Sequence, residues 1–106
     1  MRIAVVSAFY SDGMGYAENC LPKFLAALGH EVHLITSTLN VYATSPDYVA
    51  NYGAFLGPAE QPAGLHQIDG YRVHRLPYSL MGGYVFMRGL GATLRSLAPD
   101  VVHCTE

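Results

Sequence analysis

The sequence predicts an α/β fold, namely a Rossmann-like three-layer αβα sandwich with a mainly parallel sheet and an added β-hairpin. Apolar, strand-like runs alternate with amphipathic, helix-like segments, which is the pattern of a parallel sheet covered by helices. A glycine-rich stretch directly follows the first apolar run, as in folds that bind phosphates beside a helix N-terminus. Of the 106 residues, 51% are hydrophobic and 13% are charged, so we expect residues 1–106 to fold as one domain.

The first half of the chain is predicted as strand, glycine loop, helix and strand. Residues 2–8 contain an apolar run that barely alternates, which is typical of a strand buried on both faces. Residues 9–15 form a loop, residues 16–28 form a helix, and residues 31–37 form the second strand. The helix is expected to bury one face made of Cys20, Leu21, Phe24, Leu25 and Leu28.

The middle of the chain is predicted as a long connection followed by a hairpin. Residues 38–64 are the least regular part, with a short helix expected over residues 46–55. Asp69-Gly70 lies between two short strands, 65–68 and 71–76, and predicts a hairpin with a type I′ turn.

The last part is predicted as a helix and a final strand. Gly82-Gly83 is interpreted as the entry to a helix over residues 84–97. Pro99-Asp100 ends that helix and precedes the strand 101–104. Right-handed crossovers then predict the order 3-2-1-4 for the parallel strands, with residues 2–8 inside the sheet.

Charge and cysteine content exclude several classes of protein. The formal net charge is −2 and the six Lys and Arg residues are scattered, so no basic stripe for nucleic acid is present. No apolar run reaches the roughly 20 residues that span a bilayer, and the short first run is interpreted as a strand rather than a signal peptide. Cys20 and Cys104 lack metal-ligand spacing and are expected to be free, buried thiols in a reducing cytoplasm.

The glycine loop is only a partial dinucleotide fingerprint. Gly13 and Gly15 fit the first two glycines of G-x-G-x-x-G, but Glu18 occupies the third position. No acidic residue ends the second strand, where Thr36-Ser37-Thr38 stands, so NAD binding is disfavoured and no cofactor is expected. We expect the loop to face a phosphate or a sugar, the alternative being a turn that serves only chain geometry.

Four segments, in this order and at this spacing, resemble one known family. They are Gly15-Tyr16-Ala17-Glu18-Asn19 through Gly29-His30-Glu31-Val32; Ile68 to Pro77; Leu90 to Leu97; and Pro99-Asp100-Val101-Val102-His103-Cys104-Thr105-Glu106. Together they resemble the N-terminal domain of family 4 glycosyltransferases of the GT-B fold. The resemblance extends over the whole chain and is weakest over residues 38–64.

The resemblance implies an enzyme with two Rossmann-like domains that face each other across a cleft. The C-terminal domain would hold the nucleotide-diphosphate sugar, while the N-terminal domain shapes the acceptor site and brings its glycine loop near the donor diphosphate. The family's E-x7-E acidic pair belongs to the C-terminal domain, so no catalytic residue is expected in this chain, which would be a truncated N-terminal half. His103 lies one strand too early to be the histidine that the family places in its N-terminal domain.

Candidate substrate-binding residues lie after the first and last strands. They are Gly13, Met14, Gly15, Tyr16, Glu18, Asn19, His103 and Glu106. Glu18 can contact a sugar hydroxyl or act as a first-turn carboxylate favoured by the helix dipole, and Asn19 can instead cap the helix. His103 can face a ligand or be a hydrogen-bonded core histidine, whereas His30 and His33 are expected at the surface or an edge.

Tyrosines are more numerous than a core of this size requires. Their rings with polar tips suit stacking on sugars or a membrane-interface acceptor, the alternative being ordinary half-buried packing. The tyrosines in question are Tyr10, Tyr16, Tyr48, Tyr52, Tyr78 and Tyr84. A cytoplasmic protein, with peripheral contact at the inner face of the membrane as an option, is therefore expected.

Three functions compete at this point. The first is the acceptor-side domain of a transferase that moves a sugar from a nucleotide-diphosphate sugar to a glycan or lipid-linked acceptor. The second is a free-standing Rossmann-like module for a nucleotide or phosphorylated metabolite, and the third is a subunit of a split glycosyltransferase. For a truncated transferase domain, the strand 101–104 is expected at a sheet edge, where it or the open cleft face favours a homodimer that results from the truncation.

Overall fold

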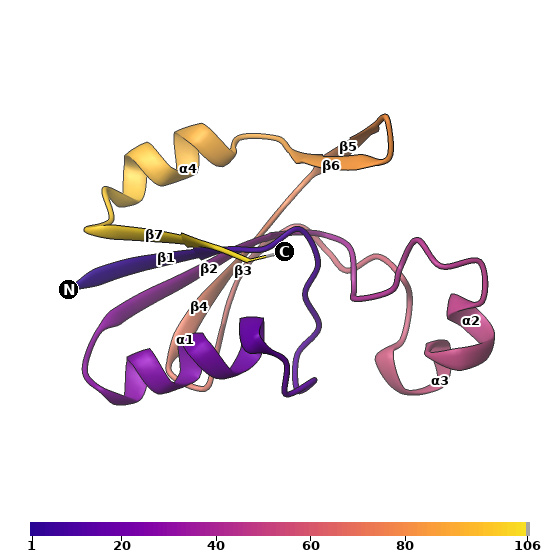
Figure 1. The fold of residues 1–106 in the computed structure, drawn as a ribbon, viewed down its shortest axis with the longest axis horizontal. Coiled ribbons are helices and arrows are strands. Elements are labelled where there is room, and N and C mark those ends of the chain that lie inside the picture. Colours follow the sequence, from indigo (N-terminus) through magenta and orange to yellow (C-terminus); the bar gives the residue numbers. More distant parts are fainter. Residues whose placement is uncertain (106) are drawn as a thin grey trace.

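The computed structural model describes residues 1–105 and shows a mixed α/β fold (Figure 1). The main sheet has five strands in the order β3-β4-β2-β1-β7. Their bounds are β1 Arg2–Val6, β2 Glu31–Ser37, β3 Gly64–Ile68, β4 Tyr71–Leu76 and β7 Val101–Cys104. Strand β4 pairs with β2, β2 with β1 and β1 with β7, all in parallel, and only β3 runs antiparallel, against β4.

One face of the sheet is covered by α1 (Ala17–Ala27), which lies below it in Figure 1. Leu21, Leu25 and Ala26 of α1 pack against buried side chains of β1, β2 and β4. Phe24 and Leu28 are exposed (63% and 75%), so the prediction that they share the buried face is wrong. The apolar face of α1 is formed by Leu21, Leu25 and Ala26. Phe24 and Leu28 lie at the side of this face, where they remain in contact with solvent.

The other face is covered by α4 (Leu90–Leu97), which lies above the sheet in Figure 1. Leu90, Leu94 and Leu97 pack against Ala4, Val6 and Ile35 of the central strands. A mostly parallel sheet with a helix on each face is therefore present. The first strand lies inside the sheet, as predicted, but ends at Val6 rather than residue 8.

The predicted helix over residues 84–97 is wrong in its first part. Residues Tyr84–Met87 form a strand, β6, which pairs antiparallel with β5 (Tyr78–Met81) in a separate two-stranded sheet. Gly82 and Gly83 are the turn of this second hairpin and have positive φ (58° and 83°), as a type I′ turn requires at both central residues. The glycine pair therefore reverses the chain and does not lead into a helix.

The first hairpin matches its prediction. Strands β3 and β4 pair antiparallel around Asp69 and Gly70, and both turn residues have positive φ. The long connection carries two short helices, α2 (Tyr48–Asn51) and α3 (Gly53–Leu56), where one helix over 46–55 was expected. Within residues 1–105, none of the helices has the length and apolar character needed to cross a membrane.

Candidate functional site

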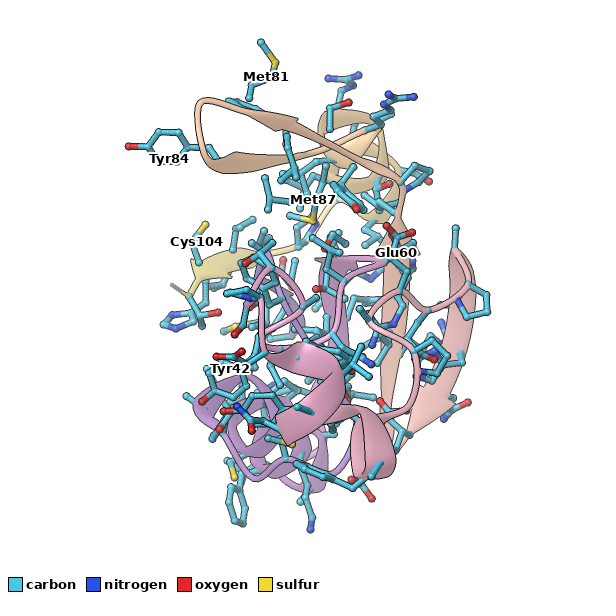
Figure 2. All side chains as sticks on the ribbon, turned by 90° about the vertical axis from the view of Figure 1, so that its right-hand side faces the viewer. Tyr42, Glu60, Met81, Tyr84, Met87 and Cys104 are labelled. Atoms are coloured by element: carbon cyan, nitrogen blue, oxygen red, sulfur yellow. The ribbon has the colours of Figure 1, made fainter. Side chains whose placement is uncertain are left out.

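The candidate site lies at the carboxyl ends of the parallel strands. Figure 2 looks toward this edge, with α2 and α3 in front and Tyr42 and Glu60 labelled beside them. From β1 the chain continues to β2 on one side, whereas β7 lies on the other side of β1. Open α/β sheets bind ligands at such a reversal of strand order, so the loop after β1 is in the position where a ligand is expected.

The glycine loop has the backbone conformation that its glycines permit. Gly13 and Gly15 have φ of 77° and 73°, and a Cβ at either position would meet no atom within 4 Å. The glycines are therefore needed for the turn itself and not for close packing inside this chain. Met14 is half-buried between them, and Tyr16 is the exposed residue that precedes α1.

Asn19 ties the glycine loop to the helix. Its side chain accepts a hydrogen bond from the backbone N–H of Tyr16 (3.3 Å) and donates one to the carbonyl oxygen of Ser11 (2.8 Å). The residue is buried, with 8% of its surface exposed. Both ends of its amide are thus engaged within the protein, which makes Asn19 a residue that positions the loop.

A hollow of about 300 Å³ opens beside the loop. It is lined by Phe9, Tyr16, Glu18, Val41, Tyr42 and Thr44. Tyr16 and Tyr42 share a hydrogen bond between their hydroxyl groups (2.7 Å), which raises the pKa of Tyr16, and their rings meet edge to face. Glu18 is half-buried at this hollow, so a carboxylate and two aromatic rings border one space.

Tyr42 is held in an unusual backbone conformation. Its φ is 62°, in the left-handed region, which typically costs a residue with a side chain about 1–3 kcal/mol. The ring stacks on Tyr52 of the long connection, with centroids 4.7 Å apart and planes 19° from parallel. Packing by Tyr52 therefore holds the Tyr42 ring at the rim of the hollow, where 44% of the residue remains exposed.

A second hollow, of about 260 Å³, lies on the other side of Asp12. Its polar side chains are Asp12, Gln61, His66 and Arg75. A smaller hollow of about 120 Å³ shares Asp12, Gln61 and Arg75 with it and adds Asn40. Asp12 and His66 are both partly exposed, with His66 Nε2 3.4 Å from Asp12 Oδ1.

Arg75 is a buried cation whose hydrogen-bond partners are all neutral. Its guanidinium donates to the carbonyl oxygens of Tyr10 (2.8 Å), Ser37 (3.0 Å) and Leu39 (3.4 Å), and to Asn40 Oδ1 (3.4 Å). Only 5% of Arg75 is exposed, and no ion pair to it forms among residues 1–105. Burial lowers the pKa of Arg75, and the nearby Asp12 carboxylate partly opposes this shift.

Two hollows at one edge thus offer complementary chemistry. Asp12 and Glu18 can accept hydrogen bonds from hydroxyl groups, Gln61 and His66 can donate them, and the buried Arg75 adds a positive charge. Aromatic rings at the first hollow supply an apolar surface of the kind that stacks on sugar rings. A polyhydroxylated ligand that carries a negative charge fits this set of groups.

The last strand places its candidate residues differently from the sequence interpretation. His103 pairs in register with Val5, but β7 is an edge strand and His103 is exposed. The alternative of a core histidine is therefore wrong, because no further strand or helix covers this part of β7 among the described residues. Glu106 lies outside the described residues. Cys104 is exposed and Cys20 is half-buried, so the prediction of two buried thiols is wrong, although both cysteines are free.

A buried histidine was predicted at the surface. His33 is 2% exposed, and its Nε2 contacts Glu31 Oε2 (2.7 Å) while its Nδ1 contacts His74 Nε2 (2.8 Å). The Glu31 carboxylate also accepts a hydrogen bond from Arg2 Nε (2.6 Å). This polar group starts at the amino end of β2, so it lies apart from the hollows at the carboxyl edge.

Sequence reasoning missed Arg75, the most buried charge of the site. A signal was present, because Arg75 has the same parity in β4 as the buried residues Tyr71 and Val73. Alternate residues of a strand share a face, so the parity assigns Arg75 to the covered side.

No metal site is apparent: within residues 1–105, no three His, Cys, Asp or Glu side chains gather in a way that could hold a metal ion.

Comparisons with protein-family models, with curated proteins and with solved structures find no match for this chain.

Proposed function

We propose that this chain is the Rossmann-like, acceptor-side domain of a glycosyltransferase. The enzyme would transfer a sugar from a nucleotide-diphosphate sugar to a glycan or lipid-linked acceptor. The observation that carries the proposal is the hollow beside the glycine loop, where Tyr16, Tyr42 and Glu18 border one space. Rings with polar tips next to a carboxylate are suited to a sugar, which has both apolar ring faces and hydroxyl donors.

Two further observations support this proposal. The sheet is mostly parallel with a helix on each face, and the glycine loop follows its central strand at the carboxyl edge. The four segments that resemble family 4 glycosyltransferases include this loop and the start of α1. In the proposed enzyme the loop approaches the donor diphosphate, and a donor domain stabilises the leaving diphosphate electrostatically.

The residues of this chain would then have distinct tasks. Tyr16 and Tyr42 would stack on or border the acceptor sugar, and Glu18 would accept a hydroxyl hydrogen bond. Arg75 would attract a negatively charged part of the acceptor into the second hollow, since no carboxylate pairs with it in the described chain. Asn19 would keep the loop in position.

Calorimetry with uridine and guanosine diphosphate sugars tests whether donor binding requires the other domain. The 106-residue chain should bind these donors very weakly and transfer no sugar, because the donor domain supplies most contacts. A micromolar dissociation constant, about −8 kcal/mol, would contradict the proposal. When a donor domain is supplied, Tyr42→Ala should raise the acceptor KM, and the control change Phe24→Ala at an exposed position of α1 should not.

Arg75 is buried and forms no ion pair with a carboxylate among residues 1–105, which favours one alternative function. A free-standing module that binds a nucleotide or a phosphorylated metabolite would use the positive charge of this guanidinium to attract the phosphate into the second hollow. The micromolar binding that contradicts the transferase proposal would support this module. Co-purification of a second chain that binds the donor would instead indicate a split glycosyltransferase.

A further inference from the structure

The β5–β6 hairpin exposes more apolar side chains than its role in the fold requires. Leu80, Met81, Tyr84 and Phe86 are 55%, 63%, 73% and 53% exposed. Figure 2 shows Met81 and Tyr84 pointing away from the body of the protein, whereas Met87 points back toward it. The hairpin forms its own two-stranded sheet and projects beyond the main sheet (Figure 1).

The register of the hairpin assigns these residues to two faces. Met81 pairs with Tyr84 and Ser79 pairs with Phe86, so these four side chains share one face. Met87 lies on the opposite face and packs against the core beneath α4. A hairpin anchored through one face needs polar residues on the other, yet this outer face carries Met81, Tyr84 and Phe86.

The hairpin and α4 carry basic residues and no carboxylate of their own, and the Glu60 carboxylate reaches only Tyr78 at the start of β5. From Gly70 to Pro99 the sequence has no Asp or Glu, although the whole chain has eight of them and a net charge of −2. Arg88 and Arg95 are both exposed there. Arg88 Nε donates a hydrogen bond to Ser79 Oγ (3.0 Å), which places this guanidinium at the base of the outer face. The hairpin and α4, which carries Arg95, lie on the same side of the main sheet (Figure 1).

We infer that the outer face of the β5–β6 hairpin docks on the surface of an anionic phospholipid bilayer. Met81 and Phe86 would enter the boundary between headgroups and acyl chains, with Tyr84 at the interface that its amphipathic ring prefers. Arg88 and Arg95 would meet the lipid phosphates. The inference does not rest on the proposed transferase activity, because docking is measured without a sugar donor.

The shape of the hairpin favours a bilayer over a protein partner. Two strands of four residues form a narrow ribbon that ends in a glycine turn. A stable protein interface usually buries about 800 Å² on each partner, which such a ribbon offers only if a partner encloses it. Lipids rearrange around a narrow apolar protrusion, so a bilayer needs no matching groove.

Vesicle sedimentation with the full chain tests the inference. At low salt the protein should bind vesicles of phosphatidylglycerol and should bind vesicles of phosphatidylcholine at least about fivefold more weakly, since each basic residue contributes about 1 kcal/mol near an anionic surface. Added salt should weaken the binding to phosphatidylglycerol. Absence of binding to phosphatidylglycerol, or equal binding to both lipids, would overturn the inference.

Matched variants locate the contact. Phe86→Ser should lower the partition coefficient about 10- to 100-fold, because an aromatic side chain no longer leaves water. Phe24→Ser removes a phenylalanine that is even more exposed, from α1 on the opposite face of the sheet, and should have no effect. Arg88→Gln should reduce binding to phosphatidylglycerol about fivefold. Equal losses for Phe86→Ser and Phe24→Ser would contradict the assignment to the hairpin.

A fluorescent probe keeps the test valid if Phe86→Ser does not fold. The chain contains no tryptophan, so Tyr84→Trp introduces a single reporter at the hairpin and Phe24→Trp a single control. With phosphatidylglycerol vesicles, emission of the Tyr84→Trp variant should shift to shorter wavelength and that of Phe24→Trp should not. A shift that appears with protein concentration in the absence of lipid would identify a second copy as the occupant and would overturn the inference.

Discussion

A pair of buried tyrosines connects the loop after β1 to β4, and substitutions there offer a quantitative test of the core. Tyr10 is fully buried and Tyr71 is 1% exposed, with their hydroxyl oxygens 2.6 Å apart. Burial raises the pKa of both hydroxyl groups, so both stay protonated near neutral pH. Each hydroxyl therefore uses the other as a hydrogen-bond partner inside the core.

Removal of one hydroxyl should cost more than removal of both. Tyr10→Phe or Tyr71→Phe leaves a buried hydroxyl without its partner, which typically costs about 1–3 kcal/mol of unfolding free energy. The double variant removes both polar groups and should cost no more than either single variant. The singles should thus lower the melting temperature by about 4–8 °C per kcal/mol, and the coupling free energy should be about 1–3 kcal/mol.

Urea denaturation followed by circular dichroism measures these differences. The slope of free energy against urea concentration should be the same in all variants, so that midpoints report stability alone. Tyr84→Phe serves as the control, because its hydroxyl is on an exposed residue and should change stability by less than about 0.5 kcal/mol. If the double variant loses the sum of the two single losses, the hydroxyl groups are not coupled and the reasoning is refuted.

Three further predictions follow from single features. Hydrogen bonds from His33 and Arg2 lower the pKa of Glu31 from 4.5 to about 2, so their stabilisation is complete above the unfolded pKa and is lost as pH falls through the folded pKa. Glu31→Gln should therefore make the urea midpoint less dependent on pH between these two values, and an unchanged loss of stability in acid would contradict this. Gly83 has φ of 83°, which a valine side chain disfavours and an asparagine tolerates. Gly83→Val should therefore disrupt only the β5–β6 hairpin and raise amide exchange there but not in β1 or β2, whereas Gly83→Asn should be tolerated. The apolar edge strand β7 should cause self-association that light scattering detects and Val102→Lys weakens, and a monodisperse wild-type monomer at high micromolar concentration would reject this.

The two hairpins show what local sequence can and cannot predict. Asp69-Gly70 predicted a hairpin because Asp-Gly between two apolar-containing runs favours such a turn, and both turn residues have positive φ in the structure. Gly82-Gly83 has the same turn chemistry, but Tyr84-Val85-Phe86-Met87 is apolar throughout and fits a helix as well as a strand. Only pairing with Tyr78–Met81 decides between them, and that pairing is a tertiary feature.

The candidate site was predictable in part. The glycine loop and the start of α1 were located from strand, glycine and helix signals, and the structure places them at the carboxyl edge. The role of Tyr42 was not visible, because it depends on stacking against Tyr52 across an irregular connection. Arg75 and His33 were missed because a charged or polar residue in a strand is usually taken to face solvent.

The central claim is that the carboxyl edge of the sheet binds a carbohydrate acceptor. The most direct measurement is a titration of the isotopically labelled full chain with N-acetylglucosamine 1-phosphate and with mannose 1-phosphate, followed by two-dimensional NMR. At millimolar ligand, the account predicts shifts at Tyr16, Glu18, Tyr42 and Arg75 for at least one sugar phosphate, with none at Glu31 and none anywhere in the Tyr42→Ala variant. Shifts confined to the amino end of the sheet, or no shifts with either ligand, would contradict it.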